Sequence, residues 1–356
     1  MLSTNLVKQV LLDFSSFYGE YRQNLSAILL TDNKYLWLGS DETSTIERLS
    51  LIDDKTFGQH QHYQVGNYIS LPAPEDEEID IEGLAYIDNY LWFVGSHSWK
   101  RKKVKDDASD TKNIQRLSKI EFEANRYILG KIPLIDGQLY KSCPHPQDPN
   151  IQLSAAKLEL SPKGNTLVDA LLTDPHLGSF IKSQIPSKDN GFDIEGIVVC
   201  ENRVFLGLRG PVLRGWAIII ELELTNTNSE LLKLNPIGEN NQLYQKHFVF
   251  LNGLGIRDIC VDGESLLILA GPTMDLDGPV RVYRLDNWRN LSADTLSKPE
   301  LIMNIPFGDG EEHAEGITLF QQTTGADELL VVYDSPAAVR LVGDGGMTAD
   351  VFQFHH

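Results

Sequence analysis

The chain has 356 residues, of which 42% are hydrophobic and 23% charged, a composition typical of a soluble globular protein with a substantial core. Its formal net charge of −19 argues against nucleic acid or an anionic membrane as a binding partner. The sequence has no run of about 18 apolar residues, which excludes a membrane-spanning helix, and its N-terminus lacks the basic start of a secretory signal.

One hairpin pattern recurs from near the start of the chain to near its end. Each copy has a β-rich strand, a turn containing Asp-Asn, Glu-Asn or Asp-Gly, and a second strand that ends in Gly or Asp. The final copy differs in having a longer polar turn. The copies occupy residues 24–41, 80–97, 193–211, 255–272 and 313–336.

The spacing of the copies predicts how many units the fold contains. The motif glycine, or the residue in its place, stands at Ala27, Gly83, Gly196, Asp258 and Gly316, with intervals of 56, 113, 62 and 58 residues. Because the second interval is about twice the first, we expect a degenerate unit between Gly83 and Gly196. Six four-stranded units around an axis form a β-propeller, so we predict an all-β fold with residues 1–356 as a single six-bladed domain.

A five-bladed propeller is the alternative, because the weak unit contains a helical pattern. Within residues 165–180, apolar side chains fall at Leu167, Val168, Leu171 and Leu172, which is the spacing of one helix face. Pro175 then ends or kinks the helix. A short helical insert here, in place of a sheet, leaves five blades.

The hairpin at 193–211 shows where charged residues gather. If Cys200 faces Arg203 across a two-residue turn, Glu195 lies opposite Leu208 and Asp193 opposite Gly210. Carboxylates before the first strand and Arg209 after the second then meet at one end of the hairpin.

The same registers place ionisable residues from several units on one rim of the propeller. Four of them occupy equivalent positions at the first strands: Glu82, Glu195, Arg257 and Glu315. Others precede the first strands or follow the second strands: Asp41, Asp80, His97, Asp193, Arg209, His313 and Asp334.

This rim favours a binding or catalytic site. Glutamates held close together raise one another's pKa, so Glu195 and Glu315 are candidate acid and base catalysts, assisted by His97 and His313. The remaining rim residues are candidate ligand-binding groups, since arginines clamp phosphate or carboxylate and carboxylates hold Ca²⁺ or another divalent cation. The alternative is structural: the glutamates bond the neighbouring blade and pair with the arginine to tie the ring together.

The repeated motifs resemble a known family. Asp-Ile-Glu-Gly at 80–83 and 193–196, His-Ala-Glu-Gly at 313–316 and Leu-Arg-Gly-Pro at 208–211 are similar to the bacterial domain-of-unknown-function 3616 family. The resemblance runs from about residue 24 to the end, and the family has no established activity. A more distant resemblance is to phytase-like and esterase-like propellers, whose carboxylate array cannot be matched here residue by residue.

Two functions follow as expectations. The first is a propeller that binds a small anionic or metal-associated ligand at the channel mouth and hydrolyses an ester, phosphoester or lactone. The second is a non-enzymatic scaffold for a protein partner. Loop fragments at 275–278 and 309–312 have only part of a calcium-loop pattern. Three cysteines without a Cys-x-x-Cys pair favour reduced thiols and a cytoplasmic location.

Overall fold

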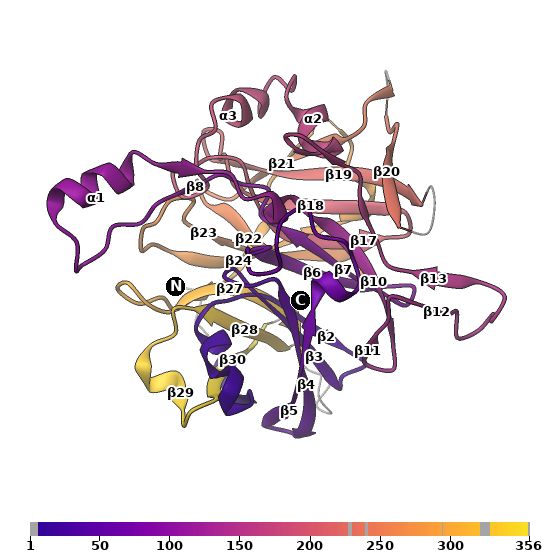
Figure 1. The fold of residues 1–356 in the computed structure, drawn as a ribbon, viewed down its shortest axis with the longest axis vertical. Coiled ribbons are helices and arrows are strands. Elements are labelled where there is room, and N and C mark those ends of the chain that lie inside the picture. Colours follow the sequence, from indigo (N-terminus) through magenta and orange to yellow (C-terminus); the bar gives the residue numbers. More distant parts are fainter. Residues whose placement is uncertain (1–5, 227–229, 239–240, 294, 321–327, 355–356) are drawn as a thin grey trace.

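The computed structural model describes residues 6–226, 230–238, 241–293, 295–320 and 328–354. Strands dominate these residues, and the sheets are arranged around a common centre in a propeller-like fold (Figure 1). None of the helices in these ranges has the length and apolar character needed to cross a membrane. The long turn expected at 321–327 lies outside the described residues.

Five antiparallel units of similar build supply most of the strands, and each begins with one of the hairpins expected from the sequence. The first unit contains β2 (Leu25–Thr31), β3 (Tyr35–Ser40), β4 (Thr45–Asp53) and β5 (Thr56–Gln64). The second contains β6 (Ile81–Ile87), β7 (Tyr90–Gly95), β10 (Leu129–Ile135) and β14 (Ala156–Leu158). The third contains β17 (Asp193–Cys200), β18 (Arg203–Gly210), β19 (Trp216–Asn226), β20 (Leu231–Asn235) and β21 (Gln245–Phe250).

The last two units complete the ring. The fourth contains β22 (Gly255–Asp262), β23 (Ser265–Gly271), β24 (Val280–Asp286) and β26 (Glu300–Ile305). The fifth contains β27 (His313–Leu319), β28 (Glu328–Asp334), β30 (Gly346–Gln353) and, from the other end of the chain, β1 (Leu6–Asp13). Strand β1 pairs antiparallel with β30 and briefly parallel with β5, so it joins the fifth unit to the first.

The first strands of the units line the centre of the fold. Strand β2 packs against β6, β6 against β17, β17 against β22, β22 against β27, and β27 against β2. Five apolar clusters fill the spaces between neighbouring units; one of them, for example, joins Val198 and Phe205 of the third unit to Ile256 and Ile268 of the fourth. Each sheet is thus covered on both faces by its neighbours.

The motif glycines allow this close approach of the first strands. A Cβ atom at Gly83 would lie 2.9 Å from the backbone nitrogen of Ile197, and one at Gly316 would lie 2.8 Å from the Ile28 side chain. Asp258 stands in the same position of the fourth unit. Its carboxylate accepts hydrogen bonds from the amides of Ile259 at 2.7 Å and Ile317 at 2.8 Å, which ties β22 to β27.

The sixth unit expected between Gly83 and Gly196 is not confirmed. The described chain between β14 and β17 holds a two-stranded ladder and two helices; a second short hairpin precedes β14. The predicted helical insert is present as α2 and α3. Asn165 begins α2 by accepting hydrogen bonds from the amides of Leu167 and Val168. These elements are β12 (Ser142–Pro144), β13 (Gln152–Ser154), β15 (Leu160–Ser161), β16 (Gly164–Asn165), α2 (Thr166–Leu171) and α3 (Gly178–Lys182).

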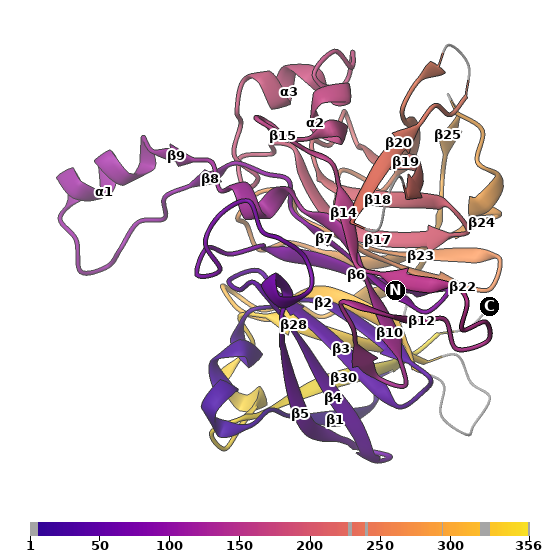
Figure 2. The same cartoon turned by 45° about the vertical axis from the view of Figure 1, so that its right-hand side comes forward.

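An arm projects from the second unit, clear of the body of the molecule in both views (Figures 1 and 2). It consists of β8 (Lys100–Arg101), α1 (Asp110–Leu117) and β9 (Ile120–Glu121), and α1 has no buried residue. The other short strands are β11 (Gln138–Leu139), β25 (Leu296–Ser297) and β29 (Leu341–Val342). The 3-10 helices are η1 (Ser16–Gln23), η2 (Val65–Asn67), η3 (Ala124–Tyr127), η5 (Trp288–Asn290) and η6 (Ala338–Arg340).

Candidate functional site

All five inner hairpins contain a β-bulge at the same place. The register shifts near the start of each first strand, so that the strand carries one residue more than its partner. A bulge re-aims the side chain of the extra residue out of the regular alternation. The residues at these shifts are Ser26, Glu82, Glu195, Arg257 and Glu315.

The bulge also corrects one detail of the expected register. Cys200 pairs with Arg203 and Asp193 with Gly210, as predicted, but Leu208 faces Ile194 and not Glu195. Sequence spacing alone could not reveal the extra residue, because a second irregularity at Arg209 of β18 compensates it and restores the pairing of Asp193 with Gly210.

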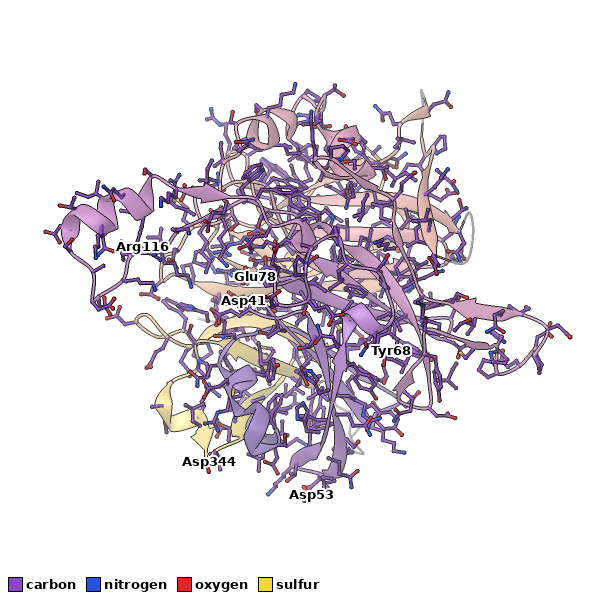
Figure 3. All side chains as sticks on the ribbon, viewed as in Figure 1. Asp41, Asp53, Tyr68, Glu78, Arg116 and Asp344 are labelled. Atoms are coloured by element: carbon purple, nitrogen blue, oxygen red, sulfur yellow. The ribbon has the colours of Figure 1, made fainter. Side chains whose placement is uncertain are left out.

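A cavity of about 410 Å³ opens at the bulged ends of the inner strands. Its walls are mostly charged. In Figure 3 two of its residues, Asp41 and Glu78, lie near the centre of the view, on the body of the molecule, whereas Arg116 lies on the projecting arm. The arm contributes one side of the opening through residues of β8 and the loop after it. The innermost lining residues are Asp41, Asp80, Glu82, Asp193, Glu195, Arg209 and Glu315.

Two arginines and two glutamates form a chain of ion pairs along one wall; Glu195, Arg209 and Glu315 line the cavity, and Arg257 joins the glutamates without lining it. Arg257 Nη1 donates to Glu315 Oε1 at 2.5 Å and to Glu195 Oε2 at 3.3 Å. Arg209 Nη1 donates to the other oxygen of Glu195 at 2.8 Å, and its Nε donates to the Thr273 carbonyl at 3.1 Å. All four residues are at most 9% exposed. The structural role considered for the ring therefore fits this wall, whose charges pair with one another.

Other carboxyls that line the cavity are less well paired. Glu82 is 7% exposed, and its carboxyl has no hydrogen bond or ion pair to any residue that the structure describes. Asp41 Oδ1 and Asp193 Oδ1 are likewise buried, and neither has a hydrogen-bond partner within the described ranges. Asp193 Oδ2 is 3.8 Å from Arg209 Nη1, too far for a hydrogen bond.

The carboxyls of this cavity differ in their acidity. Burial, and then the nearby charges of Asp80 and Glu195, raise the pKa of Glu82 well above its usual value. Burial likewise raises the pKa of Asp41 and of Asp193. Burial would also raise the pKa of Glu315, but Arg257 and Arg209 outweigh it and leave this pKa below its usual value. The cavity thus combines carboxyls whose pKa is raised with one whose pKa is lowered.

Two cationic groups of the site were missed by the sequence reasoning. Arg126 of η3 donates to Asp80 Oδ2 through Nε at 2.8 Å and through Nη2. Lys188 lines the cavity and forms no ion pair with the described residues; although burial opposes it, carboxylates including Glu315 raise its pKa. Both residues come from irregular segments between the repeats, so no repeated motif could reveal them.

His97 is not part of this cavity. Its Nδ1 donates to the Gly95 carbonyl at 2.7 Å, and its Nε2 accepts from Asn165 Nδ2 at 2.6 Å. Burial lowers the pKa of His97 to about 4, so the ring is neutral and both of its nitrogens are used. It lines a different cavity, between the second unit and α2, and could not assist Glu195 directly.

His313 and Asp334 lie at the edge of the site. His313 Nε2 is 3.2 Å from Asp277 Oδ1, whose carboxylate also accepts from the Gly310 amide at 3.0 Å. Burial and the charge of Glu315 raise the pKa of Asp334 to about 6. Both residues line a small side cavity of about 30 Å³ that also contacts Arg257 and Glu315.

The structure offers no support for a metal site. Within the described ranges, no group of three or more His, Cys, Asp or Glu residues is placed to hold a metal ion. The two fragments with part of a calcium-loop pattern contact each other instead, through the hydrogen bond between Asp277 and the Gly310 amide.

Solved structures resembling this chain do so with low identity. A streptogramin B lyase structure is 10% identical with a TM-score of 0.37, over 99% of this chain and 100% of that one. The PQQ-bound aldose sugar dehydrogenase of Streptomyces coelicolor is 10% identical with a TM-score of 0.36, over 98% of this chain and 99% of the other. Virginiamycin B lyase from Staphylococcus aureus is 12% identical with a TM-score of 0.32, over 91% of this chain and 67% of the other.

In two further matches the chain spans only 65% and 58% of the other protein's length. These likenesses concern the fold and say nothing of activity. Among curated proteins, no significant match was found. The model of one family, described as proteins of unknown function (DUF3616), matches residues 24–350. Since this match covers most of the sequence, the chain belongs to the DUF3616 family.

Proposed function

We propose that the protein is a five-bladed propeller that binds a small polar molecule in the cavity at the bulged ends of its inner strands. The blade count is supported by the closed packing order of β2, β6, β17, β22 and β27 and by the five apolar clusters between neighbouring units. Three of the five bulge residues, Glu82, Glu195 and Glu315, line this shared opening.

One observation carries the proposal: some of the carboxyls that line the cavity pair with arginines and others do not. A purely structural ring explains the wall on which arginines join Glu195 to Glu315. It does not explain Glu82, nor the buried oxygens of Asp41 and Asp193 that have no partner in the described chain. Buried polar groups in folded proteins are normally hydrogen-bonded, so groups facing a cavity without a partner favour a ligand that supplies one.

The chemistry of the unpaired groups indicates the class of ligand. A buried carboxyl accepts hydrogen bonds and, when protonated, also donates one, so Glu82, Asp41 and Asp193 suit a ligand with hydroxyl or amino groups. Lys188 offers a positive charge to the same space and suits an acidic group. A small hydroxylated or amino-bearing acid satisfies both requirements, whereas a simple anion would leave the carboxyls unpaired.

Hydrolysis of such a molecule is the second candidate function. It is favoured by the opposite pKa shifts of Glu82, which is raised, and Glu315, which is lowered. A protonated carboxyl and an ionised one facing the same space are the groups that general acid and base catalysis requires. Ester or lactone derivatives of hydroxy acids are the substrates to test, with Glu82→Gln and Glu315→Gln as the variants expected to lose turnover.

A thermal-shift titration tests the binding proposal. Gluconate and glucosamine, which carry several donors, should raise the melting temperature more than acetate, which carries none, at equal concentration. The response should weaken about two- to ten-fold in Glu82→Gln, because a hydrogen bond to a neutral group contributes about 0.5–1.5 kcal/mol. Glu300→Gln is the control, since this exposed residue of β26 pairs only with Arg284. Equal responses to all compounds, or an unchanged response in Glu82→Gln, would refute the proposal.

A further inference from the structure

A second cavity, of about 430 Å³, lies between the second unit and the helical insert. In both cartoon views α2 and α3 sit together at one end of the molecule, with β8 nearby (Figures 1 and 2). Residues adjacent in the chain line different cavities. Trp99 and Tyr127 line the second cavity, whereas their neighbours Lys100 and Arg126 line the first, 410 Å³ cavity. The two cavities therefore lie on opposite sides of one shared wall.

Aromatic rings form one side of this second cavity. Trp99 and Phe122 have ring centroids 5.3 Å apart, and Phe122 stacks on Tyr127 at 4.9 Å with an interplanar angle of 30°. Tyr127 in turn contacts His97 at 5.6 Å. The insert supplies the facing side, mainly through aliphatic side chains of α2 and α3. A cavity of this size, lined by rings and aliphatic groups, is typical of a small-molecule site.

The charge of this cavity is opposite to that of the rest of the protein. The chain has 50 acidic residues, yet none of the residues lining the cavity is Asp or Glu. Two lysines do line it, Lys163 and Lys182, and both are exposed. Neither ammonium group is ion-paired within the part of the chain that the structure describes. In a protein of net charge −19, such a local reversal selects for an anionic group at the rim.

The buried polar groups of the cavity do not compete for a ligand. His97 uses both ring nitrogens, one on the Gly95 carbonyl and the other on Asn165. The same Asn165 caps α2, so these bonds fix the insert against the second unit and hold the cavity open in one shape. The apolar interior, the two lysines and Gln184 remain for recognition.

We propose that this cavity is a second binding site, specific for an amphipathic aromatic anion. The planar rings of the ligand would pack against Trp99, Phe122 and Tyr127, and its carboxylate or sulfonate would lie toward Lys163 and Lys182. The inference does not depend on the 410 Å³ cavity at the bulged ends of the inner strands, because no residue lines both cavities.

The test uses 2-naphthoate as the probe and its uncharged analogue 2-naphthalenemethanol as the comparison. Each compound is titrated into the whole 356-residue chain, and binding is measured by calorimetry. Saturable binding of 2-naphthoate at one site, with a dissociation constant below about 1 mM, is expected. The double variant Lys163→Gln/Lys182→Gln should weaken 2-naphthoate about four- to twenty-five-fold, since each exposed charge contributes about two- to five-fold, and should leave the neutral analogue unchanged. Lys233→Gln, an exposed lysine of β20, is the matched control and should change neither.

A cavity-filling variant locates the site. Ile181→Trp should abolish binding of both compounds, and Leu172→Trp serves the same purpose if the first variant does not fold. Undiminished binding of 2-naphthoate to a folded cavity-filling variant, or the absence of saturable binding to the wild type, would overturn the proposal. Equal weakening of the charged and neutral compounds in the double lysine variant would overturn its anionic part.

Discussion

Glu82→Gln should stabilise the protein at neutral pH and leave it unchanged in acid. The Glu82 carboxyl is 7% exposed and has no hydrogen bond or ion pair to the described residues. Burial and the nearby carboxylates raise its pKa well above the value of 4.5 that it has when unfolded. Glutamine has the same shape as a protonated glutamate but cannot ionise, so the substitution removes only the cost of keeping this group uncharged.

The magnitude follows from proton linkage. Above pH 4.5 the unfolded chain releases the proton of Glu82 while the folded chain retains it, so wild-type stability falls as the pH rises toward the folded-state pKa. Each pH unit in this window costs the wild type about 1.4 kcal/mol relative to the variant. For 356 residues, an unfolding entropy of about 2.1 cal/mol/K per residue gives about 0.75 kcal/mol per degree. The variant should therefore gain about 2 °C in melting temperature per pH unit.

Calorimetric melting of wild type and Glu82→Gln between pH 4.5 and 8 measures this difference directly. It should be near zero at pH 4.5, rise steadily, and level off above the folded-state pKa. Taking the difference between the two proteins cancels the other raised carboxyls, such as Asp41 and Asp334. A difference that does not vary with pH, or a variant less stable than the wild type at pH 7.5, would refute the assignment of an unpaired Glu82.

Three further outcomes are expected. Arg257→Met should lower the free energy of unfolding by about 3–5 kcal/mol in urea titrations, because it leaves two buried glutamates without their shared partner; a loss under 1 kcal/mol would contradict the ion-pair chain. Asp258→Ala should cost about 2–3 kcal/mol by the same measurement, since two amides of neighbouring inner strands lose their acceptor. The His97 ring should stay neutral with its proton on Nδ1 from pH 5 to 8, and nitrogen NMR shifts that titrate near pH 6.5 would show this to be wrong.

The repeated hairpin allowed much of the fold and part of the site to be predicted. Because the motif glycine marks close contact between inner strands, residues beside it in different units had to lie near one another. That reasoning brought together Glu195, Arg257 and Glu315, which are in direct contact. It could not show that a bulge aims these side chains, because these strands are buried on both faces and lack the apolar–polar alternation that an extra residue would interrupt.

His97 shows where the repeat misleads. By position it corresponds to Arg209, which lies within β18 and reaches the acidic cavity. The chain instead leaves β7 at Gly95, and His97 adopts a left-handed conformation with φ of 57°. That turn places its side chain on the other side of the wall between the two cavities, toward Asn165. A positive φ at a residue other than glycine is set by tertiary contacts and cannot be read from spacing.

The blade count expected from the intervals is not confirmed, for a different reason. The 113-residue interval is the length of two units, but the projecting arm, the short hairpins and the helices α2 and α3 occupy the added chain. The number of residues between two motifs shows how long the inserted segment is, but it does not determine which secondary structure the segment forms. The helical spacing within 165–180 was the better guide, since it pointed to an insert.

The pairing of β1 with β30 has a consequence for biosynthesis. These strands are partners although more than 330 residues separate them, so the ring stays open until the last strand has left the ribosome. Until then β1 and the neighbouring edge of β28 expose unpaired backbone groups, the kind of surface on which strands of other chains add. The interval between synthesis of the first and last strands is thus the stage at which this protein is most exposed to aggregation, and at which a chaperone would have most effect.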